Sequence, residues 1–458
     1  MKIVVPAPYV PPETPFANDK LKREPFANAL TNLVQNLDDP AVITIDAPWG
    51  EGKTTFAKMW RASLKSKNCR CIYIDAFAND YLDDPFVVLV GEIATYIQET
   101  YSAEHPIFSS IESVLKKASR AGVKLLSFGT KIGLKAATLG ILKDNDFKDM
   151  EEIKEAVTND SFDFANNLFE KKLRDHKADA ATVEDFKNTL SDFAKQIKED
   201  TSYPLVLIID ELDRCRPTYA VDFIEKIKHI FSVENVIFTL ILNKNQLAAA
   251  VSSIYGEKLE ATQYLQKFFT IETSLSKNED DVNDDYRAFC NHVYNALGID
   301  AGNDVSSLQS TMIGLSELFS LSFRDIEKCY SHIALYYGAK SLTFNMAPLV
   351  SFLVIVKVRY PQYYGNFRSG SSLEVIEAAE VYQKLVTNIK VLEKHHIQKL
   401  IPMLHFCTLT QEKYKAIDPE DRDITSYEQF LWHINLERED VIPLISRRLD
   451  LFNIVQQA

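Results

Sequence analysis

Hydrophobic and polar positions along the chain follow two different periods. Runs of mainly apolar residues, many of them β-branched, occupy 41–45, 205–209 and 235–243, the last with an asparagine at each end. Uninterrupted runs of this kind are typical of strands that are buried on both faces of a parallel sheet. Between these runs, apolar residues recur every three or four positions, which predicts amphipathic helices. The pattern therefore predicts an α/β fold with a parallel sheet.

The strand pattern ends near residue 274. An acidic, polar stretch, SKNEDDVNDDY, follows at 276–286, and helical periods dominate from there onward. Composition shifts of this kind mark domain boundaries. We therefore predict one α/β domain over 1–274 and an all-helical C-terminal domain over 275–458.

The first domain contains a large predicted helical insertion at about 101–200. Charged residues in its second half alternate with Phe, Leu and Ile at three- and four-residue intervals, which predicts two or three amphipathic helices. The last of these helices is expected to start near Thr182. We interpret the insertion as a lid that covers one flank of the sheet, with a partner-binding surface as the alternative.

The composition indicates a folded protein of a reducing compartment. A chain of 458 residues that is 46% hydrophobic can fill at least two globular cores. Its 64 acidic and 51 basic side chains leave a net charge of -13, which argues against direct binding of nucleic acid. Six scattered cysteines favour a cytoplasmic location. The segment 1–16 is broken by prolines, so we expect an extended arm rather than a secretory signal.

A loop rich in chain-bending residues follows the first strand pattern. The segment DAPWGEGKTT, at 46–55, matches the phosphate-binding pattern GxxxxGK[ST], except that Ala47 replaces the first glycine. Gly50 and Gly52 would let backbone N–H groups turn toward a polyphosphate, while the following helix directs its positive end at the same anion. A glycine turn ahead of a surface helix is the alternative. We predict a nucleotide-binding loop made of Ala47, Pro48, Trp49, Gly50, Glu51, Gly52, Lys53, Thr54 and Thr55.

Two side chains of this loop and an acidic pair carry the predicted chemistry. Lys53 is expected to neutralise the β- and γ-phosphates, and Thr54 to supply a hydroxyl ligand for Mg²⁺. Asp210 directly follows the run at 205–209, and we expect it to hold the metal, through a water molecule, from the tip of an adjacent strand. Glu211 is predicted to orient and deprotonate the attacking water. An acidic cap of a strand end is the alternative interpretation of this pair.

Other polar residues near these motifs have less specific roles. In nucleotide hydrolases with such a carboxylate pair, a polar residue placed like Asn243 often senses the γ-phosphate; an asparagine that starts the next helix is the alternative. Arg214 and Arg216 fit either salt bridges or an arginine that acts between protomers. The segment NKNQ, at 243–246, has Gln where guanine-binding motifs have Asp, so ATP is predicted over GTP.

Together these motifs resemble those of the KAP-family P-loop NTPases. The most distinctive parts are Trp49 inside the loop, the D-R-C-x-P tail at 213–217 and YLQKFF at 264–269, and the resemblance spans roughly 14–365. It implies a P-loop NTPase core with a helical extension. The family includes membrane-associated scaffolds and bacterial proteins of phage exclusion or defence. Related proteins often bring an arginine from the helical domain to the nucleotide, which would be Arg324 here; a surface arginine is the alternative.

Many members of that family carry membrane-spanning helices between the two motifs. The candidate here is 121–142, which is long enough to span a bilayer. Its lysines, among them Lys124, Lys131 and Lys135, lie on one stripe of a helical wheel, and each costs about 2.5 to 3.5 kcal/mol near mid-bilayer. We therefore expect a soluble helix. A peripheral helix at the inner face of the membrane and a helix inserted in a bundle are the alternatives.

These features predict a Mg²⁺-dependent ATPase that acts as a nucleotide-driven conformational switch. Hydrolysis would be coupled to movement between the α/β core and the helical region. The resemblance adds a role in a bacterial anti-phage or exclusion system. The alternative is an ATP-bound scaffold, or a membrane-associated partner-binding module, with little turnover of its own. Protein partners or self-association would use the helical regions.

Overall fold

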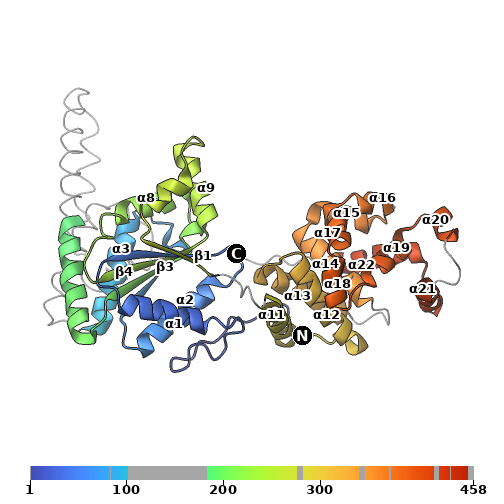
Figure 1. The fold of residues 1–458 in the computed structure, drawn as a ribbon, viewed down its shortest axis with the longest axis horizontal. Helices are drawn as coiled ribbons and strands as arrows, with labels where there is room; N and C mark the ends of the chain where they lie inside the picture. Colours follow the sequence, from blue (N-terminus) through green and yellow to red (C-terminus); the bar gives the residue numbers. More distant parts are fainter. Residues whose placement is uncertain are drawn as a thin grey trace, which may run out of the picture.

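The structure is a computed structural model that describes 2–82, 84–101, 183–275, 282–339, 346–370, 373–416, 422–433 and 435–451. These residues form an α/β lobe and a helical lobe that meet along one side (Figure 1). The segment 121–142 and most of the predicted insertion lie outside the described residues. Within the described ranges, no helix combines the length and the apolar character needed to cross a membrane.

A five-stranded parallel sheet forms the centre of the α/β lobe, with the strand order β2-β3-β4-β1-β5. The strands are β1 (Ala41–Asp46), β2 (Cys71–Asp75), β3 (Leu205–Asp210), β4 (Val236–Leu242) and β5 (Ile271–Ser274). The three predicted strand runs correspond to β1, β3 and β4. The predicted α/β class with a parallel sheet is confirmed.

The position of β4 corrects one expectation. We expected the tips of β1 and β3 to be adjacent, but β4 lies between them and pairs with both. Asp46 is in register with Leu242, and Asp210 is in register with Ile241. The two tips are therefore two strand spacings apart, or roughly 10 Å. They still end at the same edge of the sheet, because all the strands are parallel.

Helices cover both faces of this sheet, as the alternation along β3 shows. Leu205, Leu207 and Ile209 belong to one hydrophobic cluster, whereas Val206 and Ile208 belong to another, and all five side chains are fully buried. Burial on both faces explains why the run has no polar positions. The helices of the first cluster are α3 (Pro85–Thr100), the helix at 183–201, α8 (Pro217–Ile227), α9 (Lys244–Tyr255) and α10 (Ala261–Gln266), and those of the second are α1 (Glu24–Gln35) and α2 (Lys53–Ser66).

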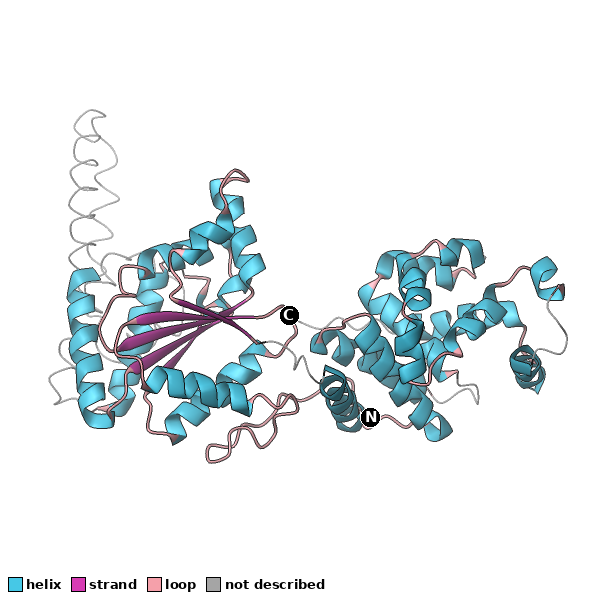
Figure 2. Cartoon of the chain, viewed as in Figure 1, coloured by secondary structure: helices cyan, strands magenta, loops and turns pink. Residues whose placement is uncertain are grey.

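Every described element after β5 is a helix (Figure 2). The α-helices of this lobe are α11 (Val282–Leu297), α12 (Val305–Leu318), α13 (Phe323–Gly338), α14 (Ala347–Arg359), α15 (Pro361–Arg368), α16 (Leu373–Glu377), α17 (Glu380–Thr387), α18 (Ile389–Lys394), α19 (Leu400–Thr408), α20 (Gln411–Lys415), α21 (Arg422–His433) and α22 (Val441–Asp450). The domain boundary at 274/275 stays a prediction; it coincides with the end of β5.

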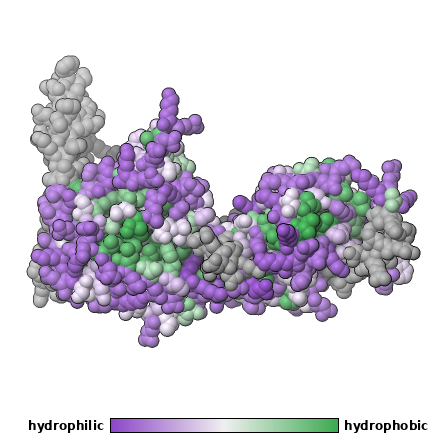
Figure 3. All heavy atoms as spheres, viewed as in Figure 1, coloured by the Kyte–Doolittle hydropathy of each residue, from purple (hydrophilic) through white to green (hydrophobic). Residues whose placement is uncertain are grey.

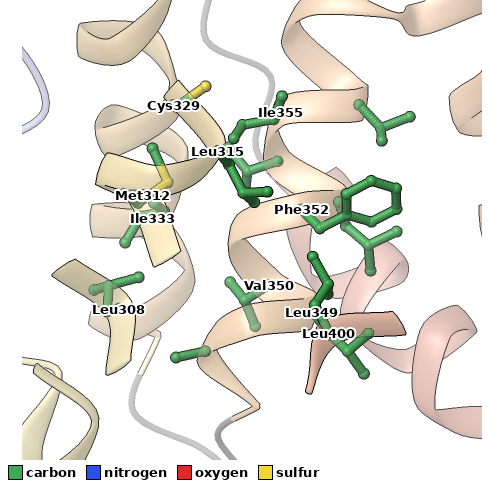
Figure 4. Packing of buried hydrophobic residues seen from close by; sticks show 14 of the residues in the cluster. Leu308, Met312, Leu315, Cys329, Ile333, Leu349, Val350, Phe352, Ile355 and Leu400 are labelled. Atoms are coloured by element: carbon green, nitrogen blue, oxygen red, sulfur yellow. The ribbon is translucent and has the colours of Figure 1, made fainter. Parts of the chain in front are cut away.

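The helical lobe has a hydrophobic core of its own. Side chains from α12, α13, α14 and α19 interdigitate there, among them Met312, Ile333, Phe352 and Leu400 (Figure 4). α14 is the central helix, since every residue at 349–356 is fully buried. The face of the molecule seen in Figure 3 is mainly hydrophilic on both lobes, with apolar patches near the middle of each. Each lobe therefore has its own hydrophobic core, and the two lobes contact each other.

Candidate functional site

The loop between β1 and α2 has the backbone geometry of an anion-binding site. Gly50 and Gly52 have φ values of +86° and +77°, in the left-handed region that favours glycine. α2 begins at Lys53, directly after Gly52. The first N–H groups of a helix have no intrahelical acceptor and lie at its positive end. The strand–loop–helix context predicted for the phosphate-binding pattern is therefore present.

Asp213 connects this loop to the tip of β3. The Trp49 indole N–H donates to Oδ2 of Asp213 at 2.5 Å, and Nζ of Lys53 lies 3.9 Å from the same oxygen. Nζ of Lys53 also donates to the carbonyl oxygens of Ala47 at 2.7 Å and Pro48 at 3.2 Å. Burial lowers the pKa of Lys53, and the charge of Asp213 opposes this shift. The sequence marked Trp49 and Asp213 as distinctive, but their contact was not predicted.

The acidic pair meets the loop through Thr54. The hydroxyl of Thr54 donates to Oε1 of Glu211 at 2.8 Å. Asp210 is fully buried, and burial raises the pKa of its carboxyl to about 6, although hydrogen bonds from Tyr73 and Thr54 oppose the shift. Glu211 has a φ of +61°, a strained conformation for a residue with a side chain. The structure thus places Thr54, Asp210 and Glu211 together, as predicted from the sequence.

Tyr73 is a site residue that the sequence did not reveal. Its hydroxyl donates to Oδ2 of Asp210 at 2.9 Å, while the backbone N–H of Glu211 donates to Oδ1 of Asp210 at 2.9 Å. Both carboxylate oxygens therefore have a donor, which fixes the orientation of the Asp210 side chain. The sequence places Tyr73 near the end of a strand. This position indicates a contact with Asp210 only if β2 is known to pair with β3.

The two arginines after the acidic pair have different surroundings. Arg214 lines the site, and its Nη2 lies 3.1 Å from Oε1 of Glu211. Arg216 instead contacts Asp80, with Nε 3.9 Å from Oδ2. Asp80 also accepts the backbone N–H of Arg216 at 3.0 Å. Each arginine therefore has a carboxylate partner within this chain.

Asn243 caps a helix. Its Oδ1 accepts the backbone N–H groups of Asn245 at 3.1 Å and Gln246 at 3.3 Å, at the start of α9. This is the local role given above as the alternative to a phosphate sensor. Asn243 is not among the described residues that line the cavity below.

The helical lobe contacts the loop through the first turn of α13. The backbone N–H of Arg324 donates to the carbonyl oxygen of Gly50 at 3.3 Å. A Cβ atom at Gly50 would lie 2.8 Å from Oγ of Ser322 and 2.9 Å from Cβ of Arg324, so this contact needs glycine. The guanidinium of Arg324 makes no ion pair with the carboxylates that the structure describes. Arg324 therefore lies beside the loop, and its contact with a nucleotide stays a prediction.

A cavity of about 370 Å³ lies between the two lobes, within the size range of small-molecule sites. One wall is formed by residues of the α/β lobe, namely Gly50, Gly52, Lys53, Thr54, Thr55, Glu211 and Arg214. Much of the rest is formed by the helical lobe, through Phe289, His292, Phe323, Arg324 and Glu327, and by arm residues at 5–8 and 18–21. The other predicted loop residues, Ala47, Pro48, Trp49 and Glu51, are not among the lining residues, and neither is Asp210.

The N-terminal arm, residues 2–22, completes the cavity and lies against both lobes. The backbone N–H of Lys2 donates to the carbonyl oxygen of Leu297 at 2.7 Å, and the hydroxyl of Ser331 donates to that of Ile3 at 2.7 Å. Directly after the arm, the buried guanidinium of Arg23 donates to the carbonyl oxygen of Glu51 at 2.7 Å. The sequence predicted an extended arm but gave no sign of this placement.

The site offers suitable ligands for Mg²⁺. Thr54 and Asp210 supply oxygen atoms, which are the donors that this hard cation prefers. The described residues contain no group of three or more His, Cys, Asp or Glu side chains that could hold a metal ion. Mg²⁺ usually takes one or two protein ligands and completes its shell with phosphate oxygens and water.

Comparisons with known proteins relate this chain to one family. A crystal structure of Cdc6p from Pyrobaculum aerophilum is similar over 97% of this chain and 98% of its own, at 12% sequence identity and a TM-score of 0.37. A comparison with curated proteins gave no match. The family model described as KAP family P-loop domain matches residues 23–337, which include the loop, the acidic pair and the first turn of α13. The match covers more than half of the chain, and the protein therefore belongs to the KAP family of P-loop NTPases.

Proposed function

We propose that this protein binds ATP with Mg²⁺ in the cavity between its lobes and hydrolyses it. The observation that carries the proposal is the convergence of three separate elements on one cavity. These are the loop with Lys53 and Thr54, the strand tip with Glu211, and the first turn of α13 with Arg324. Hydrolysis of a nucleoside triphosphate needs this combination of hydrogen-bond donors, positive charge and a general base.

Each side chain has a defined part in the proposed reaction. Lys53 would exchange the carbonyl oxygens of the loop for β- and γ-phosphate oxygens. Mg²⁺ would be held by Thr54 and Asp210 and, when bound, would neutralise charge on the phosphates. Glu211 would accept a proton from the attacking water, whose oxygen bonds to the γ-phosphorus as the bond to ADP breaks. Arg324 would stabilise negative charge on the transferred group.

The same contacts suggest how the nucleotide would move the lobes. Gly50 belongs to the loop, and its carbonyl oxygen accepts the N–H of Arg324 in the helical lobe. A change in the loop on binding or hydrolysis would therefore be transmitted to α13. We propose that the protein acts as a nucleotide-driven conformational switch. The family resemblance suggests a role in a bacterial anti-phage or exclusion system, and the scattered cysteines suggest a cytoplasmic location.

One observation favours a second candidate function. Glu211 accepts from Thr54 and lies beside Arg214, so the proposed base is engaged by other side chains. An ATP-bound scaffold, in which a partner must release Glu211 before turnover, would have this arrangement. Helical regions are the surfaces proposed for such partners or for self-association.

A nucleotide-hydrolysis assay on purified variants tests the first proposal. Lys53→Ala should abolish ATP binding, whereas Glu211→Gln should leave ATP bound and lower kcat about 100-fold or more. Glu257→Gln is a matched control because Glu257 is exposed and is not among the cavity-lining residues. Equal activity in all three variants would refute the proposal. A parent protein that binds ATP but hydrolyses it only with an added partner would favour the scaffold.

A further inference from the structure

Glu327 occupies a particular position along the cavity wall. Arg324 and Glu327 both line the cavity, and their spacing places them on one face of α13. This helix touches Gly50 of the loop at its first turn, and its Ser331 binds Ile3 of the arm further along. Glu327 lies between these two contacts. It is therefore one turn farther from the phosphate-binding loop than Arg324.

The cavity lining combines charged and apolar side chains. Lys53, Arg214 and Arg324 supply positive charge, and apolar and aromatic residues such as Leu21 and Phe289 line the same cavity. The ring of Phe289 packs 4.7 Å from the ring of Phe323, and 6.3 Å from that of His292. Burial lowers the pKa of His292, and so does nearby Lys20, which favours a neutral ring. Aromatic and neutral side chains of this kind suit the nucleoside part of a nucleotide rather than its phosphates.

Three carboxylates line the cavity, and two of them have partners. Asp19 accepts the backbone N–H groups of Leu21 and Arg23. Glu211 accepts from Thr54. The carboxylate of Glu327, by contrast, has no hydrogen-bond or ion-pair partner among the described residues, although its backbone carbonyl oxygen accepts from the hydroxyl of Ser331 at 2.9 Å. Burial raises the pKa of its carboxyl, and the charge of Arg324 opposes this shift.

A carboxylate in this place needs a ligand with neutral donors. It would repel a polyphosphate, and a partly desolvated acceptor is unfavourable unless something donates to it. We propose that Glu327 recognises the nucleoside part of the bound nucleotide by accepting a hydrogen bond from it. The donor is a ribose hydroxyl or the exocyclic amine of adenine. This inference rests on the proposed function, because it assigns a role within the same cavity.

Binding measurements with four ligands test the role of Glu327. Dissociation constants are measured with Mg²⁺ for ATP, 2′-deoxy-ATP, inosine triphosphate and inorganic triphosphate, which has no nucleoside. In Glu327→Gln, ATP should bind about 10-fold more weakly, while inorganic triphosphate should bind no more weakly than to the parent. Glu393→Gln, an exposed glutamate of α18 outside the cavity lining, is the matched control. Unchanged melting temperatures establish that both variants are folded.

The ligands distinguish the two donors and the two proposals. A smaller preference for ATP over 2′-deoxy-ATP in Glu327→Gln assigns the ribose 2′-hydroxyl, and a smaller preference over inosine triphosphate assigns the amine. If Glu327→Gln weakens the binding of ATP, 2′-deoxy-ATP and inosine triphosphate by the same factor, and does not weaken that of inorganic triphosphate, the 3′-hydroxyl is assigned. An unchanged ratio of ATP to triphosphate affinity would overturn the role of Glu327 alone. A parent protein that binds none of the ligands would overturn the proposed function as well.

Discussion

Trp49 and Asp213 are joined by a hydrogen bond of 2.5 Å from the indole N–H to Oδ2, although they belong to segments that are 164 positions apart. Trp49 is 42% exposed, so the indole is not held by burial alone. Because Asp213 also lies beside Lys53, this bond fixes the loop relative to the tip of β3. Together with the hydrogen bond from Thr54 to Glu211, it links the loop to the segment that carries the acidic pair.

A double-mutant cycle should detect this link. We expect Trp49→Phe and Asp213→Ala each to lower the free energy of unfolding, and their effects to be coupled by about 1 kcal/mol because they remove the same hydrogen bond. Urea unfolding of the two single variants, the double variant and the parent provides the measurement. Strictly additive effects would show that the bond contributes nothing measurable.

Gly50→Ala should separate the lobes. The new Cβ would clash with Ser322 and Arg324, and the positive φ adds strain of about 1 to 2 kcal/mol. Gly256→Ala is a control for strain alone, since Gly256 has a φ of +87° and no atom within 4 Å of an added Cβ. We expect both variants to be destabilised, but only Gly50→Ala to show weaker ATP binding and a larger radius of gyration in solution scattering. Identical scattering from both variants would contradict this.

The titration of Asp210 should make stability depend on pH. Its folded-state pKa of about 6 lies above the value of about 3.9 for an unfolded chain. The folded state therefore binds more protons between these values, and this contribution to stability is complete below pH 4 and is lost as the pH rises through 6. Asp210→Asn removes the titration. The stability of the nucleotide-free parent should fall relative to that of Asp210→Asn from pH 4 to 7.

The gain in ATP affinity on adding Mg²⁺ should increase with pH, whereas the contribution of Asp210 to stability decreases. The proposed metal ligand is the ionised carboxylate of Asp210, so the gain in ATP affinity on adding Mg²⁺ should decrease below about pH 6. Calorimetric titration of ATP at pH 5 and pH 7, with and without Mg²⁺, measures this gain. The gain should be small at both pH values in Asp210→Asn. A gain that is equal at both pH values in the parent would exclude Asp210 as the titrating ligand.

Arg324→Ala tests the contribution of the helical lobe. If the guanidinium stabilises charge on the transferred phosphoryl group, kcat should fall roughly 100-fold. Lys328→Ala is the matched control, because Lys328 carries the same charge on the same helix and is not among the cavity-lining residues. Similar kcat values for the two variants would assign Arg324 to the surface, as the alternative interpretation has it.

The site motifs could be predicted because they are local in sequence. Asp210 and Glu211 follow a run whose burial on both faces requires a strand, and the strand-to-loop change places them at its tip. The loop from Gly50 to Thr54 is likewise readable from residue types alone, since the backbone must turn twice through conformations that favour glycine. The catalytic, sensing and metal-binding roles of these residues stay predictions.

The remaining features depend on contacts between distant segments. β4 separates β1 from β3 because of how strands pair across the sheet, and the residues of each strand do not encode their neighbours. Tyr73 reaches Asp210 only through this pairing. The cap formed by Asn243 is local, but an asparagine at the end of a strand fits a cap and a sensor equally well in sequence. The arm has no periodicity from which its contacts could be inferred.

The arm also determines when the cavity can be completed during synthesis. The hydrogen bond between Ser331 and Ile3 joins residues that are 328 positions apart. Residues near the N-terminus leave the ribosome first, but their partners on α11 and α13 emerge only after the whole sheet has been made. Domains fold as units in the order of their synthesis, so a nascent chain that ends before α13 has a folded loop and sheet but no finished cavity. ATP would therefore meet a complete binding site only on chains in which the first helices of the second lobe have already folded.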